Sequence, residues 1–299
     1  QVAKEYKPQY ISMYMKAVWY SGGKGKGLKE FRQDMLDDER ISIFSDYPDP
    51  KDCHIEGINL RGGVCSFLWD ARHKGECDFI SHINGKSYLS KRTLKTEDED
   101  ILIRYTKGLS ILKKVKEKED EFFEDYVSGR DPFGFGDGFK DYRTKETGAY
   151  TTPLYCVRKE IGYVKWSQVD KEYRPLSNKW KVLVAKASPG EDTLPHTIIS
   201  APVLSEPKSV CTNGLFVVKT VKSKAEAQNL IDYMHTSFFR FMMLLAKNGH
   251  NLTKRVYRYV PVLDLSKKWT DKMLFKRYGI TKTEQDFIKS VIKDINDKG

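Results

Sequence analysis

Two aromatic side chains on a short apolar segment have the spacing needed to hold a nucleobase. The run Val64-Cys-Ser-Phe-Leu-Trp69 is typical of a strand, and because side chains alternate along a strand, Phe67 and Trp69 share one face. Two rings on one face can stack on a base that an enzyme has rotated out of a duplex. Packing of the same rings in a hydrophobic core is the alternative, and the residues alone leave both open.

A glycine-rich turn near the N-terminus carries two cations. Lys24 and Lys26 lie in Gly22-Gly-Lys-Gly-Lys-Gly27, directly before an expected helix, where backbone amides and positive charge suit an anion. The segment fits neither the phosphate-loop pattern nor the dinucleotide-binding glycine pattern. We therefore favour a structural turn over a cofactor site, with contact between these lysines and a DNA phosphate as the alternative.

An aromatic loop lies in the middle of the chain. In Arg130-Asp-Pro-Phe-Gly-Phe-Gly-Asp-Gly-Phe139, Arg130 could bind a phosphate or a guanine edge. Phe133 and Phe135 either reach a DNA groove with it or plug a hydrophobic core. Because loops often carry function, we favour contact with DNA.

A basic and aromatic strip follows at Asn248–Tyr259. It places Lys254, Arg255 and Arg258 beside the ring of Tyr257, a combination that suits the phosphate backbone of a nucleic acid. An ordinary solvated strand edge is the competing interpretation.

Residue patterns for metal or nuclease chemistry are missing from the sequence. The five cysteines form no Cys-x-x-Cys pair, and the six histidines form no His-Glu-x-x-His pattern. Asp49 is followed by Glu56-Gly-Ile58, which lacks the lysine of a metal-dependent nuclease site. We predict no metal site and no cleavage site.

The composition favours a polyanionic partner. Lysine and arginine number 52 against 41 acidic residues, the net charge is +11, and 12% of residues are aromatic, so that charge and stacking rings are both available. A merely solvated basic surface is the alternative. No apolar run reaches membrane-spanning length and no signal-peptide pattern opens the chain, so we expect a cytoplasmic protein and no membrane partner.

The elements that must position these residues change character near residue 95. Before it, the pattern predicts strands at 10–19 and 41–45, a helix at 28–36, and an antiparallel hairpin of the runs 63–69 and 77–82. Such a hairpin commonly closes the edge of a mostly parallel sheet. A single strand-helix unit cannot form a core, so residues 1–95 look like the downstream part of an α/β domain.

The remaining residues, 96–299, predict a second, α+β domain rich in loops. A helix is expected at 109–127, and strands at 150–157, 162–166, 180–185, 197–201 and 215–219. A Ser223–Glu226 capping box precedes apolar residues at helical spacing up to Leu245. Two shorter helices are expected to begin near Thr270 and at the capping box Thr281–Glu284.

Several segments, in order along nearly the whole chain, carry a resemblance to a known family. The chain resembles the adenine-N6 DNA methyltransferases of type II restriction-modification systems, in the group whose methylase and target-recognition region share one polypeptide. The matching segments are Trp19-Tyr-Ser-Gly-Gly-Lys-Gly25, Leu28-Lys-Glu-Phe-Arg32, Ile58-Asn-Leu-Arg-Gly-Gly-Val-Cys-Ser-Phe-Leu-Trp-Asp70, Pro132-Phe-Gly134, Phe238-Phe-Arg-Phe241, Tyr259-Val-Pro-Val-Leu-Asp264 and Lys268-Trp-Thr-Asp271.

The resemblance implies which parts of the enzyme this chain holds. In that family an α/β domain binds S-adenosylmethionine, and its glycine-rich cofactor motif and Asn-Pro-Pro-Tyr catalytic motif precede the segment that matches Trp19. This sequence contains neither motif. The implied fold is the C-terminal part of a methyltransferase sheet over 1–95, followed by a target-recognition domain over 96–299, with the family's base-stacking aromatic at or beside Phe67.

The expected function follows from this division. The chain would be the DNA-recognition and partial catalytic portion of a site-specific adenine-N6 methyltransferase that flips its target base in double-stranded DNA. S-adenosylmethionine would bind the full-length protein and not this chain, which alone would be inactive and would hold no catalytic residue. A fused or separate restriction endonuclease is left open as a partner. The alternatives are a non-enzymatic nucleic-acid-binding module and a separate specificity subunit.

Overall fold

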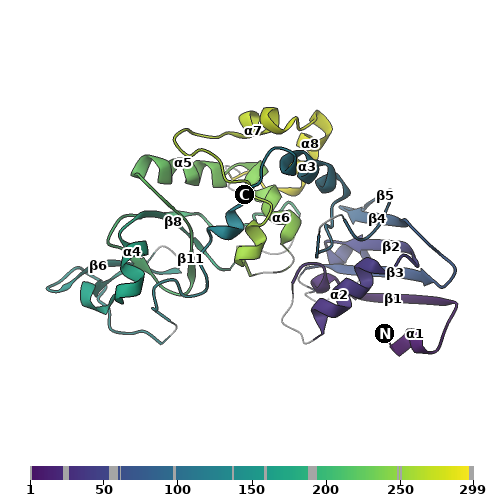
Figure 1. Ribbon diagram of the computed structural model, residues 1–299, viewed down its shortest axis with the longest axis horizontal. Coiled ribbons are helices and arrows are strands. Elements are labelled where there is room, and N and C mark those ends of the chain that lie inside the picture. The colour runs from purple at the N-terminus through teal and green to yellow at the C-terminus, as the bar shows by residue number, and fades with distance from the viewer. Residues whose placement is uncertain are drawn as a thin grey trace. The chain divides into compact units, whose positions relative to one another are not determined.

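The protein combines mixed β-sheets and helices in two compact units (Figure 1). The computed structural model describes residues 2–22, 27–53, 60, 62–96, 99–136, 138–157, 160–187, 194–247, 249 and 251–295. Unit 1 comprises residues 1–113, 190–196 and 244–250, and unit 2 comprises 114–189, 197–243 and 251–299. The predicted boundary near residue 95 lies before this division, which falls within helix α3 (Thr106–Lys116).

Unit 1 is built on a five-stranded sheet with the order β1-β3-β2-β4-β5. Strand β3 is antiparallel to both β1 and β2, β2 is parallel to β4, and β4 is antiparallel to β5. The sheet is therefore mixed, with one parallel pair among its described strands. The elements are α1 (Val2–Glu5), β1 (Tyr10–Lys16), η1 (Ala17–Trp19), α2 (Leu28–Asp37), β2 (Ile41–Tyr47), η2 (Pro50–Cys53), β3 (Val64–Asp70), β4 (Cys77–Ile83) and β5 (Lys86–Arg92).

The hairpin at the edge of this sheet is not the predicted one. Strands β3 and β4 do not pair with each other, because β2 lies between them and pairs with both. The hairpin is instead formed by β4 and β5. Its two-residue turn is Asn84-Gly85, with φ of 52° and 72°, and two positive φ values give the turn whose twist matches that of a hairpin.

One face of the sheet is buried beneath α2. Cross-strand neighbours Phe67, Phe44 and Phe79 form a row on this face, and all three belong to one hydrophobic cluster against which Phe31 of α2 packs. The periodicity of α2 explains the contact, because Leu28, Phe31 and Met35 recur at helical spacing.

The opposite face of the sheet exposes apolar side chains. Tyr14 and Leu89 lie at the two ends of the adjacent cross-strand row and are 66% and 65% exposed. Strand β1 also forms an edge, since among the described strands it pairs with β3 alone. Tyr10 and Met13 on this edge are 50% and 45% exposed. Unit 1 thus presents to solvent an open sheet edge and a sheet face on which exposed apolar side chains stand among polar ones, such as the ion pair of Lys91 and Asp78.

Unit 2 contains two three-stranded sheets, in the orders β10-β6-β7 and β11-β8-β9. Their inward side chains share one hydrophobic cluster, which includes Leu154, Leu183 and Val217. The strands are β6 (Tyr150–Tyr155), β7 (Ile161–Lys165), β8 (Trp180–Ala185), β9 (Val203–Ser205), β10 (Val210–Cys211) and β11 (Leu215–Val221). Four of the predicted strands are therefore present, 180–185 with its predicted bounds and the other three with shifted ends, whereas 197–201 is not a strand and β9 begins at Val203.

The helices of unit 2 are defined by their caps. Ser223 caps the first turn of α5 by accepting from the Glu226 amide, and the Thr281–Glu284 capping box opens α8 as predicted. The single long helix expected after Ser223 is wrong, because Thr236 caps a new helix by accepting from the Phe239 amide. The helices are α4 (Arg174–Ser177), α5 (Lys224–Met234), α6 (Ser237–Ala246), α7 (Asp271–Tyr278) and α8 (Lys282–Val291), with 3-10 turns η3 (Phe123–Asp125), η5 (Trp166–Gln168), η6 (Lys171–Tyr173) and η7 (Lys254–Tyr257).

The helix predicted at 109–127 is shorter in the structure, because α3 ends at Lys116. None of the helices in the described ranges combines the length and the apolar character needed to cross a membrane.

Candidate nucleic-acid interface

The rings of Phe67 and Trp69, predicted to stack on a base, lie in the core of unit 1. Phe67 is 8% exposed and Trp69 is 4% exposed, and both belong to the cluster beneath α2. The face that they share on β3 is therefore the buried face of the sheet. Both rings therefore pack in the hydrophobic core, which was the alternative to base stacking.

Polar contacts fix the Trp69 ring further. Its indole nitrogen donates to the Asp38 carboxylate over 3.0 Å, and the Arg40 guanidinium lies 4.8 Å from the ring centroid. Although burial alone would raise the pKa of Asp38, hydrogen bonds from Arg40 and Lys4 hold it well below its usual range. Asp38 is thus a charged anchor for the indole, which gives Trp69 a structural role.

The glycine-rich turn is described only at its two ends. Lys24 and Lys26 lie outside the described residues. At one end of the turn, the Arg32 guanidinium donates to the carbonyls of Trp19 and Gly22. At the other, Gly27 begins α2 with a φ of 80°, a left-handed conformation that favours glycine.

A buried polar network holds the turn that leads into β3. Asp46, at the end of β2, accepts from the Tyr20 hydroxyl (2.8 Å) and from the Arg104 Nε (3.1 Å), and Arg104 also donates to the Gly62 carbonyl (2.6 Å). Gly63 has a φ of +82°, and a Cβ there would lie 2.4 Å from the Tyr47 carbonyl oxygen. Backbone packing therefore explains the paired glycines in the segment that carries the resemblance.

The aromatic loop divides between surface and core. Arg130 is exposed, whereas Phe133 and Phe135 are each 2% exposed and lie in the shared cluster of the two sheets of unit 2. The two phenylalanines thus plug the core, and Arg130 alone of this group remains available to a partner.

The basic and aromatic strip is a 3-10 turn instead of a strand edge. Lys254 and Arg255 of η7 are exposed, but Tyr257 is fully buried. Arg258 is half-buried, with its guanidinium 5.2 Å from the centroid of the Tyr259 ring. Lys254 and Arg255 therefore face solvent without the stacking ring of Tyr257 that the sequence pattern predicted.

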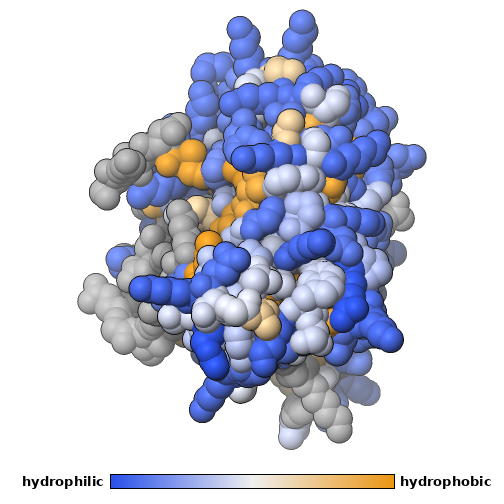
Figure 2. Space-filling model, turned by 90° about the vertical axis from the view of Figure 1, so that its left-hand side faces the viewer, coloured by the Kyte–Doolittle hydropathy of each residue, from blue (hydrophilic) through white to orange (hydrophobic). Residues whose placement is uncertain are grey.

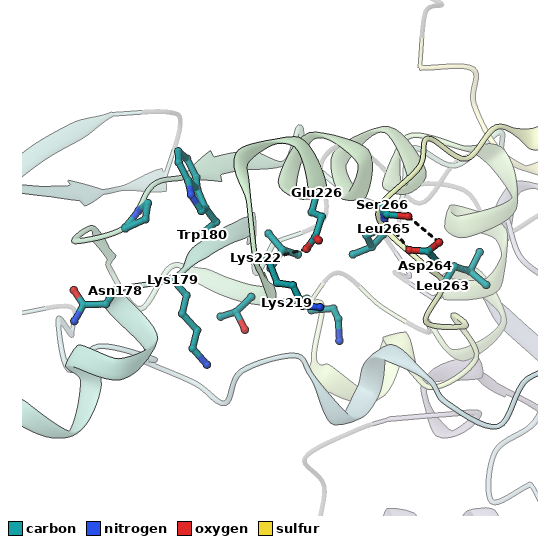
Figure 3. Close-up of a pocket in the computed structure, with 13 residues that line it drawn as sticks. Asn178, Lys179, Trp180, Lys219, Lys222, Glu226, Leu263, Asp264, Leu265 and Ser266 are labelled. Atoms are coloured by element: carbon teal, nitrogen blue, oxygen red, sulfur yellow. Dashed lines mark hydrogen bonds between the residues drawn. The ribbon is translucent and has the colours of Figure 1, made fainter.

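A groove that the sequence analysis missed gathers three other lysines in unit 2 (Figure 3). We call it the lysine groove. It has a volume of about 830 Å³. Its walls are the turn before β8 (Asn178–Trp180), the end of β11 with the following residue (Lys219–Lys222), Glu226 of α5 and the segment Leu263–Ser266, with Pro207 beside them.

Strand pairing brings the three lysines of this groove together. Trp180 at the start of β8 pairs with Val221 at the end of β11. Lys179, directly before β8, and Lys222, directly after β11, are therefore close together. The pairing shifts register between Val217 and Lys219, which is the mark of a β-bulge that re-aims side chains. Val218 is buried and Lys219 lines the groove.

The two carboxylates of the lysine groove accept hydrogen bonds from residues close to them in sequence. Glu226 accepts from the Lys222 backbone amide (2.8 Å), and Asp264 accepts from the amide and hydroxyl of Ser266 (2.9 and 2.8 Å). Within the described ranges, no ion pair joins either carboxylate to Lys179 or Lys219. The Lys219 ammonium lies over the Tyr126 ring, and burial lowers its pKa.

One side of the molecule is mostly hydrophilic, and the described residues form no candidate metal site. The side of the molecule facing the viewer in Figure 2 is mostly hydrophilic. Among the residues that the structure describes, no group of three or more His, Cys, Asp and Glu side chains could hold a metal ion.

Comparison with known proteins finds similarity at the level of structure. No family model and no curated protein matches the chain. The solved structure of the type IIG restriction endonuclease BpuSI is similar with a TM-score of 0.35 and 10% identity, over 95% of this chain and 47% of that chain. The chain thus spans about half the length of that protein.

Proposed function

We propose that this chain is the DNA-recognition and partial catalytic portion of a site-specific adenine-N6 DNA methyltransferase of a restriction-modification system. In this proposal unit 1 is the C-terminal part of a methyltransferase sheet and unit 2 is the target-recognition domain. The observation that carries the proposal is the open sheet of unit 1.

The sheet of unit 1 has the features of one part of a larger α/β domain. The sheet pairs β2 and β4 in parallel and its other neighbouring strands antiparallel, a mixture that is common in large α/β sheets with antiparallel strands at an edge, and Tyr14 and Leu89 are exposed on one of its faces. Long edge strands with apolar side chains are normally paired or covered, and β1 exposes Met13. Further strands and helices packed on these surfaces would complete the domain.

The described residues of unit 1 do not fit a site for S-adenosylmethionine. Ligands of open α/β sheets bind beyond the carboxyl ends of the strands. Two hollows among the described residues of unit 1 lie instead beside the start of β2, among Asp37, Asp38 and Arg40. In this proposal the cofactor pocket belongs to other parts of the full-length protein.

The chemistry of the target base explains why a partial domain would be inactive. Adenine N6 is a poor nucleophile, because its lone pair is delocalised into the ring. Acceptors for its two hydrogens are needed as the methyl group arrives, and the resemblance places those acceptors in the absent Asn-Pro-Pro-Tyr motif. The contribution of this chain is then to bind and orient the duplex.

Surface cations support the DNA-binding half of the proposal. The chain has a net charge of +11, and Arg130, Lys254 and Arg255 are exposed on unit 2. Such cations supply the sequence-independent part of duplex binding by neutralising phosphates.

Calorimetric titration of the chain with duplex DNA and with S-adenosylmethionine tests both halves of the proposal. We expect salt-sensitive binding of the duplex and no measurable binding of the cofactor. Tight cofactor binding would show that this chain contains the pocket for the methyl donor and would overturn the partial-domain assignment. The absence of duplex binding at low salt would overturn the recognition assignment.

A further inference from the structure

We infer that the lysine groove of unit 2 binds the sugar-phosphate backbone of DNA. The inference rests on the proposed function and adds to it a surface that none of the sequence motifs indicated. It assigns phosphate contacts to Lys179, Lys219 and Lys222.

The lysines approach the groove from separate strand ends. Lys179 precedes β8 and Lys222 follows β11, while the bulge in β11 directs Lys219 to the same groove. Three flexible cations from two neighbouring strands can follow successive phosphates along a backbone. Asn178 and Thr220 line the same groove and offer hydrogen-bonding groups of the kind that proteins use on phosphates and sugars.

The carboxylates in the groove accept hydrogen bonds from backbone amides. Glu226 and Asp264 each accept hydrogen bonds from their own backbone neighbours, which hold them in place beside the lysines. Lys219 has a lowered pKa, but it also lies over the Tyr126 ring, whose π-face favours the charged ammonium. A polyanion entering the groove would therefore meet the ammonium groups of Lys179 and Lys219 without breaking an ion pair between them and either described carboxylate.

The local backbone disfavours a small phosphate ligand as the occupant. Nucleotide phosphates typically bind the uncapped N-terminus of a helix. The N-terminus of α5 beside this groove is already capped, because the Ser223 hydroxyl accepts from the Glu226 amide (3.1 Å) and Glu226 accepts from the Lys222 amide (2.8 Å). Lysines act as mobile point charges, which suits the repeated charges of a backbone.

Fluorescence-anisotropy titrations across a salt series test the inference on the full chain. The groove variant Lys179→Gln/Lys219→Gln/Lys222→Gln is compared with a matched control, Lys145→Gln/Lys171→Gln/Lys272→Gln, which removes the same charge from exposed positions elsewhere on unit 2. Because each phosphate contact contributes about 0.9 to the slope of log K against log salt, we expect the groove variant to flatten the slope by about 2.7. The control should change it by less than half as much.

The outcomes separate this inference from the proposed function. If the unaltered chain binds duplex DNA and the groove variant binds it equally well, or if the control loses as much as the groove variant, the inference fails and the recognition function stands. If the unaltered chain binds no duplex, both fail. Loss of tripolyphosphate binding with unchanged duplex binding would assign the groove to a small anion and overturn the inference. Equal melting temperatures establish that each variant is folded. If the triple variant melts early, the double variant Lys179→Gln/Lys222→Gln replaces it, and the expected flattening of the slope is then about 1.8.

Discussion

At the scale of single residues, burial decides what the aromatic side chains do. Phe67 pairs across the sheet with Met13 and Phe44, and Phe79 lies next in the same row. Only 8% of the surface of Phe67 is exposed to solvent. Burying such a ring yields roughly 1.5–3 kcal/mol. Turning it outward to hold a base would forfeit that free energy, so its role is to pack the core of the sheet.

Replacement of Phe67 by alanine is expected to lower the stability of unit 1 by about 3–5 kcal/mol, as large cavities in cores do. Chemical denaturation monitored by fluorescence measures the effect. Tyr10→Ala on the exposed edge of β1 is the matched control and is expected to cost far less. A loss below about 1 kcal/mol for Phe67→Ala would show that the ring is outside the core.

At the scale of elements, local signals located helix ends and most strands of unit 2. The capping boxes at Ser223 and Thr281 were readable because each depends on two residues three positions apart. The break before α6 was missed because part of its cap comes from Asp271, far along the chain, which accepts from the amides of Ser237 and Phe238.

Strand order was not readable from the same signals. The runs 63–69 and 77–82 are close in sequence, but β2 inserts between them, and nothing local encodes that choice. The turn Asn84-Gly85 was the stronger hairpin signal, and it identifies the β4–β5 pair. The lysine groove was not predictable from the sequence for the same reason, because Lys179 and Lys219 come close together only through the pairing of β8 with β11.

The exposed cations of η7 lead to a further prediction. Because Lys254 and Arg255 are exposed there while Tyr257 is buried, the turn offers charge without stacking. Replacing Lys254, Arg255 and Arg258 by glutamine is expected to weaken binding of all duplex sequences alike and to reduce the salt slope by about 1 for each phosphate that is no longer neutralised. Binding measured on two unrelated duplexes checks this, and a change confined to one sequence would contradict a backbone role.

At the scale of the whole molecule, the two units present different surfaces. Unit 1 exposes Tyr14, Leu89 and Met13 on its sheet and an open edge at β1, whereas unit 2 exposes cations and the lysine groove. Apolar surface of this kind is costly in water and is characteristic of sites that meet other protein elements. In our proposal the first surface meets the remaining methyltransferase elements and the second meets the duplex.

Methyl transfer to adenine in duplex DNA is the measurement that tests the central claim most directly. The chain alone, and the chain joined to the polypeptide encoded directly upstream of it, are incubated with S-adenosylmethionine and mixed-sequence duplex DNA, and N6-methyladenine is quantified by mass spectrometry. We predict N6-methyladenine at a single sequence context with the joined protein and none with the chain alone. Duplex binding by the joined protein without any methylated adenine would contradict the assignment and leave a non-enzymatic DNA-binding module.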